Sequence, residues 1–223
     1  MPIFVFNPKN RASEHDFDKI IEKYPDINLV ISLGGDGTIL GAFEKYKDLP
    51  ILPIKSSNVC SRCFPIDDLE SIVESIKKGI IKPTQHHSLQ ATFNHTAITA
   101  LNEINIHSKN PQSAIRYRYY HHQYNSPTII ADGIVFSTPF GSTGYFRSIT
   151  NTTFEQGIGI GINNPTVHQY HQIVDINTNI DVTIERGPAL LMADNQPRII
   201  TLNENDQVNI KLSTITANIF TPI

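Results

Sequence analysis

The stretch Asn28–Leu40 constrains the fold most, because a short apolar run there ends in glycines and passes into a helical pattern. Leu29–Leu33 is apolar and partly β-branched, which predicts a buried strand. A strand that enters a helix through glycines exposes backbone amides and the positive end of the helix dipole, so Gly34–Gly37 predicts a phosphate site. The helical repeat opens at Thr38. The expected phosphate-binding residues are Gly34, Gly35, Gly37 and Thr38.

Asp36 is the unusual member of this turn, because a site for anions alone would not place a carboxylate among the amides. A carboxylate is explained there if it meets a hydroxyl group or a metal rather than phosphate itself. The alternative is a tight Gly-Asp-Gly turn that only caps a helix, and the motif alone leaves both interpretations open.

Composition restricts the class of protein. The net charge of −3 provides no basic face, so we expect no nucleic-acid partner. No apolar run approaches the ~20 residues that span a bilayer, so we expect no membrane partner. Met1–Lys9 lacks the features of a signal peptide. Two cysteines cannot build a disulfide framework, which fits a reducing interior. We therefore predict a cytoplasmic location.

Strands and helices alternate up to Pro83. The expected strands are Ile3–Phe6, Leu29–Leu33 and Pro50–Ile54. Three helices are expected. The first follows a Ser13 cap, the second runs from Thr38 to about Lys47, and the third lies between an Asp67 cap and Gly79. This alternation predicts an α/β domain with a parallel sheet at residues 1–83.

Beyond Pro83 the pattern changes to period two, and no helical pattern interrupts it. The alternating segments are Leu89–Phe93, Ala97–Leu101, Ile180–Ile184 and Val208–Leu212. We predict a mostly antiparallel β domain at residues 84–223, whose last strand can return to the first domain.

Three later segments add to the glycine turn: Ala100–Ile104, Ala131–Val135 and Ser137–Tyr145. With the turn they carry, in order, GGDGT, LNE, ADG and TPFGSTGY. The chain therefore resembles the ATP- or polyphosphate-dependent NAD kinases, which carry a GGDGT turn, an LNE strand, a GDG strand and a TPxGSTxY loop. Met192–Gln196 is similar to the family's DGQ-type segment.

The resemblance implies an α/β N-terminal domain, a β-rich C-terminal domain and a cleft between them. It implies ATP with Mg²⁺, or polyphosphate, as phosphate donor. The acceptor would be the adenosine 2′-hydroxyl of NAD, and the product NADP. It also implies a homodimer or homotetramer with NAD near a subunit interface. We assign no residue as a metal ligand.

The expected catalytic residue is Asp36, which can orient the ribose hydroxyl and accept its proton. Asn102 can read an adenine edge, and ionised Glu103 suits ribose hydroxyls. Asp132 is expected to face NAD or a neighbouring subunit, and the ring of Tyr145 to pack on the ligand. The other expected substrate-binding residues are Gly35, Gly37, Phe64, Phe140, Gly141, Ser142, Thr143, Gly144 and Ser148.

The chain departs from the family at three places. Phe146–Asn151 stands where the family has a run with Gly-Gly-Pro. Lys55–Phe64 keeps only Phe64 of the family's Asn-x-Gly-x-Leu-Gly-Phe-like loop. Met192–Gln196 contains Asp-Asn-Gln where the family has Asp-Gly-Gln. We therefore expect a divergent member. Leu52–Arg62 resembles the corresponding loop of diacylglycerol and sphingosine kinases, so a lipid kinase of the same fold is an alternative. A nucleotide-binding regulator without turnover is another.

Two further patterns have competing interpretations. Cys60 and Cys63 form a CxxC pair, which fits half a zinc site, a redox pair or structural cysteines. We favour structural cysteines, because the chain has no second CxxC. Arg116–Tyr124 interleaves basic and aromatic residues, as in proteins that stack single-stranded nucleic acid. We favour a β-hairpin with an aromatic cross-strand face.

Overall fold

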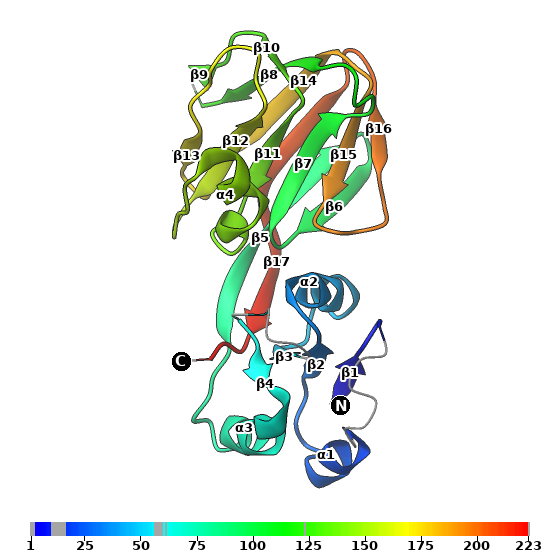
Figure 1. The fold of residues 1–223 in the computed structure, drawn as a ribbon, viewed down its shortest axis with the longest axis vertical. Helices are drawn as coiled ribbons and strands as arrows, with labels where there is room; N and C mark the ends of the chain where they lie inside the picture. The colour runs from blue at the N-terminus through cyan, green and yellow to red at the C-terminus, as the bar shows by residue number, and fades with distance from the viewer. Residues whose placement is uncertain (1–2, 10–16, 56–59, 61, 123, 223) are drawn as a thin grey trace. The chain divides into compact units, whose positions relative to one another are not determined.

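The structure is a computed structural model that describes residues 3–9, 17–55, 60, 62–122 and 124–222. The chain divides into two compact units (Figure 1). One comprises Met1–His86 and Thr216–Ile223, and the other comprises His87–Ile215. None of the helices within the described ranges is long and apolar enough to cross a membrane.

The first unit is built on a parallel sheet. Strands β1 (Phe4–Phe6), β2 (Val30–Leu33) and β3 (Ile51–Lys55) pair in that order. The far edge of β3 pairs with β4 (Phe64–Pro65) at Ile54 and with the end of β17 (Gln207–Ile219) at Ile51.

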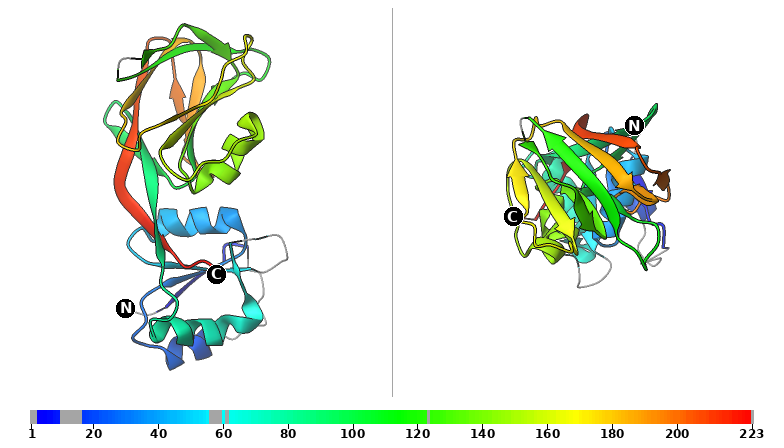
Figure 2. Two further views of the ribbon diagram at one scale, coloured as in Figure 1. Left: turned by 90° about the vertical axis from the view of Figure 1, so that its left-hand side faces the viewer. Right: turned by 90° about the horizontal axis from the view of Figure 1, so that it is seen from above.

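Helices cover both faces of this sheet. Helices α1 (Phe17–Lys23) and α3 (Leu69–Lys77) lie on one face, and α2 (Asp36–Lys45) lies on the other (Figure 2). All four residues of β2 are buried, as expected for a parallel strand between two helical layers. Side chains of α1, α3 and the strands share one core cluster, which includes Leu33, Leu52 and Val73.

The ends of these helices correct one prediction. Gly79 has φ +70°, the left-handed conformation that ends α3 as expected. Asp67 lies instead in a 3₁₀ turn (Ile66–Asp68), and the N-cap position of α3 is Asp68, whose side chain makes no capping hydrogen bond. The predicted Asp67 cap is therefore wrong. Ser13, the other predicted cap, lies outside the described residues.

The second unit contains two antiparallel layers. One sheet has the order β13-β12-β11-β7-β15-β16. Its strands are β13 (Gln172–Val174), β12 (Ile158–Asn163), β11 (Gly133–Ser137), β7 (Glu103–Ser108), β15 (Ala189–Ala193) and β16 (Ile200–Leu202). In the other layer β17, β14, β8 and β10 follow one another, and β5 pairs with both β17 and β6. Its further strands are β14 (Ile180–Arg186), β8 (Ile115–His121), β9 (Tyr124–Asn125), β10 (Ile129–Ala131), β5 (Thr84–Phe93) and β6 (Thr96–Ala100).

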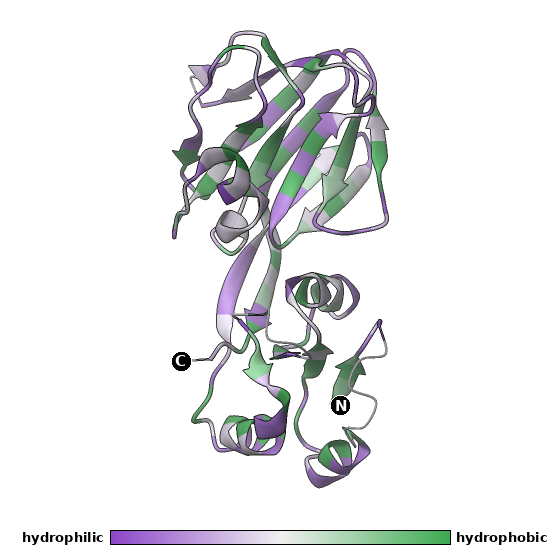
Figure 3. Cartoon of the chain, viewed as in Figure 1, coloured by the Kyte–Doolittle hydropathy of each residue, from purple (hydrophilic) through white to green (hydrophobic). Residues whose placement is uncertain are grey.

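The core of this unit lies between the two layers. Buried and less buried residues alternate along β7 and β14, and the hydropathy colours alternate along β7 (Figure 3). Inward-facing residues such as Ile104, Tyr117 and Val182 join one cluster. The predicted fold class is confirmed: an α/β part with a parallel sheet precedes a mostly antiparallel β part.

One prediction for the β region is wrong, because a helix does interrupt it. Ser137–Tyr145 is not a plain loop: a 3₁₀ turn (Gly141–Thr143) leads into α4 (Tyr145–Thr150). Only Phe146 of α4 is buried. A six-residue helix with one buried side chain has no apolar stripe from which it could be recognised.

The basic and aromatic segment forms the predicted hairpin. Strands β8 and β9 pair antiparallel, with Tyr120 opposite Asn125. The ring of Tyr124 packs on Tyr119 and His121, at centroid distances of 5.5 Å and 5.1 Å. The aromatic cross-strand face is therefore confirmed.

Candidate functional site

The glycine turn joins β2 to α2 in the first unit. Helix α2 begins at Asp36, two residues before the predicted start, with Gly35 at its N-cap position. The amide of Thr38 donates to the Gly35 carbonyl at 2.8 Å. A side chain at Gly34 would overlap Thr38, so this position needs glycine. Asp36 is exposed in the first helical turn, where a carboxylate is favoured by the helix dipole.

Cys60 and Cys63 form a disulfide that packs on this turn. The Sγ atom of Cys60 lies 3.6 Å from Oδ1 of Asp36, and Sγ of Cys63 lies 3.7 Å from the Gly34 carbonyl oxygen. Disulfide sulfurs carry no proton, so both are packing contacts rather than hydrogen bonds. Among the residues that the structure describes, no group of three His, Cys, Asp or Glu side chains could hold a metal.

Two other residues of the cysteine segment differ in their surroundings. Burial lowers the pKa of Arg62, and the negative charge of Asp36 opposes this shift, so the guanidinium group lies within electrostatic reach of that carboxylate. Phe64, an expected substrate contact, is only 7% exposed and belongs to the core cluster of the first unit.

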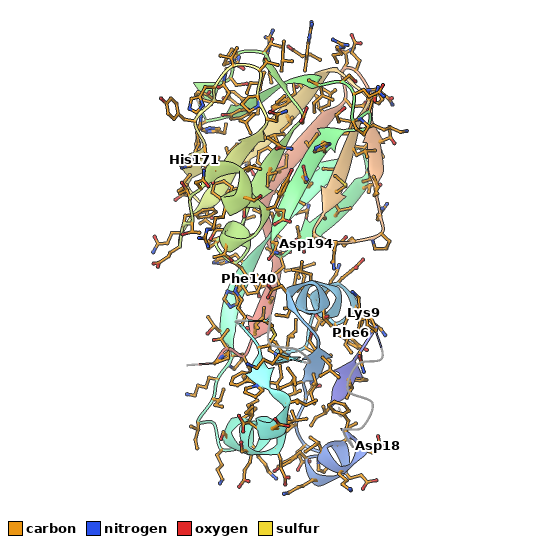
Figure 4. The ribbon with its side chains drawn as sticks, viewed as in Figure 1. Phe6, Lys9, Asp18, Phe140, His171 and Asp194 are labelled. Carbon is orange, nitrogen blue, oxygen red and sulfur yellow. A yellow bond between two sulfur atoms is a disulfide. The ribbon has the colours of Figure 1, made fainter. Side chains whose placement is uncertain are left out.

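The LNE segment forms the turn between β6 and β7 in the second unit. Three successive backbone N–H groups of this turn donate to the carboxylate of Asp194. Asp194 follows β15 and is labelled in Figure 4. Leu101 donates to Oδ2 at 2.7 Å, and Asn102 and Glu103 donate to Oδ1 at 2.8 Å and 3.0 Å.

The TPFGSTGY segment packs on the carbonyl side of the same turn. The Thr138 hydroxyl donates to the Leu101 carbonyl at 2.6 Å, and the Thr138 amide donates to the Asn102 carbonyl at 2.9 Å. A Cβ atom at Gly141 would lie 2.6 Å from Cα of Asn102. Only glycine therefore allows the two segments to approach this closely.

The side chains of this turn have buried atoms without protein partners. Oδ1 of Asn102 and Oε2 of Glu103 are buried and accept no hydrogen bond from the residues that the structure describes. Burial raises the pKa of Glu103 to about 7, and the charge of Asp194 adds to the shift. These two groups are suited to a ligand that offers hydrogen-bond donors.

Tyr145 lies beside them at the start of α4. Burial raises the pKa of Tyr145, the charges of Asp132 and Glu103 add to this, and a hydrogen bond with Asn163 opposes it. Asp132 lies between β10 and β11 and accepts a hydrogen bond from Nδ2 of Asn164 at 2.8 Å. The second unit thus brings together an amide, two carboxyl groups and a phenol.

The other predicted residues of this unit occupy different environments. Phe140 is buried, and Thr143 and Gly144 are exposed. Ser142 is buried, with Oγ 2.8 Å from the Pro139 carbonyl oxygen and 3.1 Å from that of Phe154. The exposed Ser148 donates from Oγ to the Tyr145 carbonyl at 2.7 Å. Both serine hydroxyls therefore contact main-chain carbonyls.

Sequence reasoning missed Asp194 and Thr138 as residues of this site. The signal for Asp194 was present, because Met192–Gln196 is similar to the DGQ-type segment. Nothing local in the sequence indicated that its partners would be backbone amides some ninety positions earlier.

Comparisons with known proteins relate the sequence of this chain to a family. The sequence profile of the ATP-NAD kinase C-terminal domain matches residues 101–221. An NAD kinase of Helicobacter pylori is 26% identical over 182 residues, which cover 79% of this chain and 58% of that protein. An NAD kinase of Methanosarcina barkeri is 36% identical over 127 residues, 55% of this chain and 45% of that protein. The chain thus spans about half to three-fifths of the length of these two relatives.

Two crystal structures share the fold. Yeast NADH kinase complexed with NADH superimposes with a TM-score of 0.82 at 18% identity, covering 88% of this chain and 62% of that one. An NAD kinase from Archaeoglobus fulgidus in complex with ATP superimposes with a TM-score of 0.79 at 20% identity. The match covers 98% of this chain and 92% of that one. At these identities the likeness concerns the fold alone.

Proposed function

The chain belongs to the ATP-NAD kinase family, and from this membership we propose that it is an NAD kinase. It would transfer the γ-phosphoryl group of ATP to the 2′-hydroxyl of the adenosine ribose of NAD and release NADP. The observation that supports this most is the pair of buried, unpartnered acceptors, Oδ1 of Asn102 and Oε2 of Glu103. An adenine amino group and ribose hydroxyls are donors of the kind these acceptors need.

We assign the binding roles as follows. Asn102 reads the adenine edge, Glu103 accepts from ribose hydroxyls, and the ring of Tyr145 packs on the nucleoside. Asp132 binds NAD or a neighbouring subunit, and Phe64 and Ser148 are further substrate contacts. The nucleotide-binding loop comprises Phe140, Gly141, Ser142, Thr143 and Gly144.

Asp36 is the proposed catalytic residue. Its carboxylate is exposed at the first turn of α2, beside backbone amides that can hold phosphate. A carboxylate in hydrogen-bonding reach of the 2′-hydroxyl orients it and accepts its proton as the phosphoryl group transfers. Mg²⁺ enters as part of the substrate MgATP, because this ion binds mainly through phosphates and water and needs few protein ligands.

The organisation of the protein completes the proposal. Residues 1–83 would be the nucleotide-binding domain and residues 84–223 the NAD-binding domain, in a cytoplasmic homodimer or homotetramer. The alternative of a lipid kinase rested on Leu52–Arg62, of which residues 56–59 and 61 lie outside the described residues. The alternative of an inactive regulator is tested by the same assay.

The experiment mixes purified protein, MgATP and NAD and measures NADP. Parallel reactions replace ATP with polyphosphate, NAD with NADH, and NAD with diacylglycerol vesicles. Asp36→Asn is expected to lower kcat by about 10²-fold or more, as for loss of a general base. The matched control is Asp26→Asn, at an exposed position outside the site. Production of a phospholipid, or NAD binding without turnover, would overturn the proposal.

A further inference from the structure

We propose that Asp194 is a positioning residue, which holds the Asn102–Glu103 turn in the conformation that presents both side chains to the nucleoside. This inference rests on the proposed function, because it assigns a cause to the geometry of the NAD-binding pair. It assigns Asp194 no contact with the substrate.

The carboxylate of Asp194 binds the main chain of the turn between β6 and β7. Successive N–H groups that point the same way form a concavity that binds an anion. Here the N–H groups of Leu101, Asn102 and Glu103 donate to the two oxygens of Asp194 at 2.7–3.0 Å. The protein thus supplies its own anion for the turn, and both carboxylate oxygens are directed at the main chain.

Asp194 is itself held in place by hydrogen bonds of its own segment. Its backbone adopts φ +48°, and its amide donates to the Glu103 carbonyl at 3.0 Å. Two residues later, Nε2 of Gln196 donates to the Thr99 carbonyl at 2.6 Å. The side chains of Asp194 and Gln196 therefore both bond to the main chain of β6 and the following turn.

The main chain and the side chains of the Asn102–Glu103 turn differ in their hydrogen bonding. Asp194 binds its N–H groups, and Thr138 binds its carbonyls at Leu101 and Asn102. The acceptor atoms Oδ1 of Asn102 and Oε2 of Glu103 are nevertheless buried without a partner among the described residues. The arrangement fixes the backbone and leaves two side-chain acceptors for a ligand.

The carboxyl group of Glu103 is largely buried and lies near the charge of Asp194. Among the described residues, Glu103 interacts electrostatically with Asp194, beyond β15, and with Tyr145 on α4, and Tyr145 also interacts with Asp132. Burial raises the pKa of Glu103 to about 7, and Asp194 adds to this shift. Ionised Glu103 accepts from both ribose hydroxyls, so affinity for NAD is expected to rise as the pH increases through about 7.

The test compares Asp194→Asn with the wild type in two measurements. Carboxyl ¹³C NMR of the ligand-free protein, with Glu103→Gln for assignment, is expected to show a lower pKa for Glu103 in Asp194→Asn. Steady-state kinetics are expected to show a KM for NAD raised by about 10- to 100-fold, as for a lost charged hydrogen bond, with kcat changed much less. The pH dependence of kcat/KM for NAD should shift to lower pH. A purely structural defect would not shift this profile.

The matched control is Asp206→Asn, because Asp206 also accepts a backbone N–H, that of Asn203, in a turn of the same unit. It is expected to leave the Glu103 titration and the KM for NAD unchanged. If Asp194→Asn does not fold, Asp194→Glu keeps the charge and moves the carboxylate. It is then expected to raise the KM for NAD while Glu103 keeps its high pKa.

The outcomes separate the two proposals. A folded Asp194→Asn protein with an unchanged Glu103 titration and an unchanged KM would overturn the role of Asp194. So would an Asp194→Glu protein with wild-type KM. If the wild type makes no NADP, the proposed function fails, and the NMR titration still decides whether Asp194 controls Glu103.

Discussion

The Sγ atom of Cys60 lies 3.6 Å from Oδ1 of Asp36. One half of the Cys60–Cys63 disulfide thus packs against the carboxylate proposed as the catalytic base, and the other half packs against the carbonyl of Gly34. Both cysteines are buried, with 6% of Cys60 and 4% of Cys63 exposed. The disulfide therefore supports the glycine turn from one side.

We expect the disulfide to stabilise the protein modestly. Its cysteines are only three positions apart, so the disulfide closes a short loop. By lowering the conformational entropy of the unfolded chain, a loop of this length raises the free energy of unfolding by about 2 kcal/mol. Urea unfolding of the wild type with dithiothreitol should give a free energy of unfolding lower by this amount. The Cys60→Ser/Cys63→Ser variant should match the reduced protein and not respond to dithiothreitol. Equal midpoints for oxidised and reduced wild type would contradict the prediction.

Gly141→Ala is expected to disturb the NAD-binding turn. Its Cβ atom would lie 2.6 Å from Cα of Asn102, so the loop or the turn must shift. Overpacking of this kind costs about 1–3 kcal/mol, and we also expect a higher KM for NAD. Urea unfolding and steady-state kinetics measure the two effects. Gly144→Ala is the comparison in the same segment, because its Cβ atom would meet nothing nearer than 3.2 Å and should cost less stability.

Glu103→Gln is expected to change how stability depends on pH. The pKa of Glu103 is raised from 4.5 to about 7 in the folded protein, so between these values the folded state holds a proton that the unfolded state has lost. The free energy of unfolding therefore falls as the pH rises through this range. Glutamine does not ionise, so the variant should gain about 1–3 kcal/mol relative to wild type between pH 5 and pH 8.

Urea unfolding at the two pH values measures this gain. The control is Glu155→Gln, an exposed position at which the difference from wild type should stay constant. A constant difference for Glu103→Gln as well would show that Glu103 is not buried as described.

The fold class was predictable because burial leaves a pattern in the sequence. Val30–Leu33 is buried on both faces and reads as one apolar run, whereas the half-buried β14 alternates. Helix α4 left no such pattern. Likewise, the start of α2 at Asp36 was not predicted, because Asp36 and Gly37 add no apolar side chain to the helical pattern that opens at Thr38.

The site was only partly predictable, because its decisive contacts are long-range. The motifs indicated Asn102, Glu103 and Tyr145, and the environment of these residues supports their proposed roles. The motifs did not indicate that Asp194 would bind the backbone of the Asn102–Glu103 turn. The CxxC spacing was compatible with thiols, a metal or a disulfide, and only the structure distinguishes them.

Thr138 provides the last prediction, because it holds the carbonyl side of the same turn. Its buried hydroxyl donates to the Leu101 carbonyl and accepts from the Gly141 amide at 3.0 Å. Thr138→Val keeps the shape but leaves both partners unpaired, which should cost about 2–3 kcal/mol of unfolding free energy. Thr138→Ser keeps the hydroxyl and loses one methyl group, which should cost about 1 kcal/mol.

Urea unfolding and the KM for NAD distinguish the two variants. If the hydroxyl fixes the turn, Thr138→Val should raise the KM and Thr138→Ser should leave it near the wild-type value. A larger loss for serine than for valine would mean that packing of the methyl group, and not the hydrogen bond to Leu101, holds the two segments together.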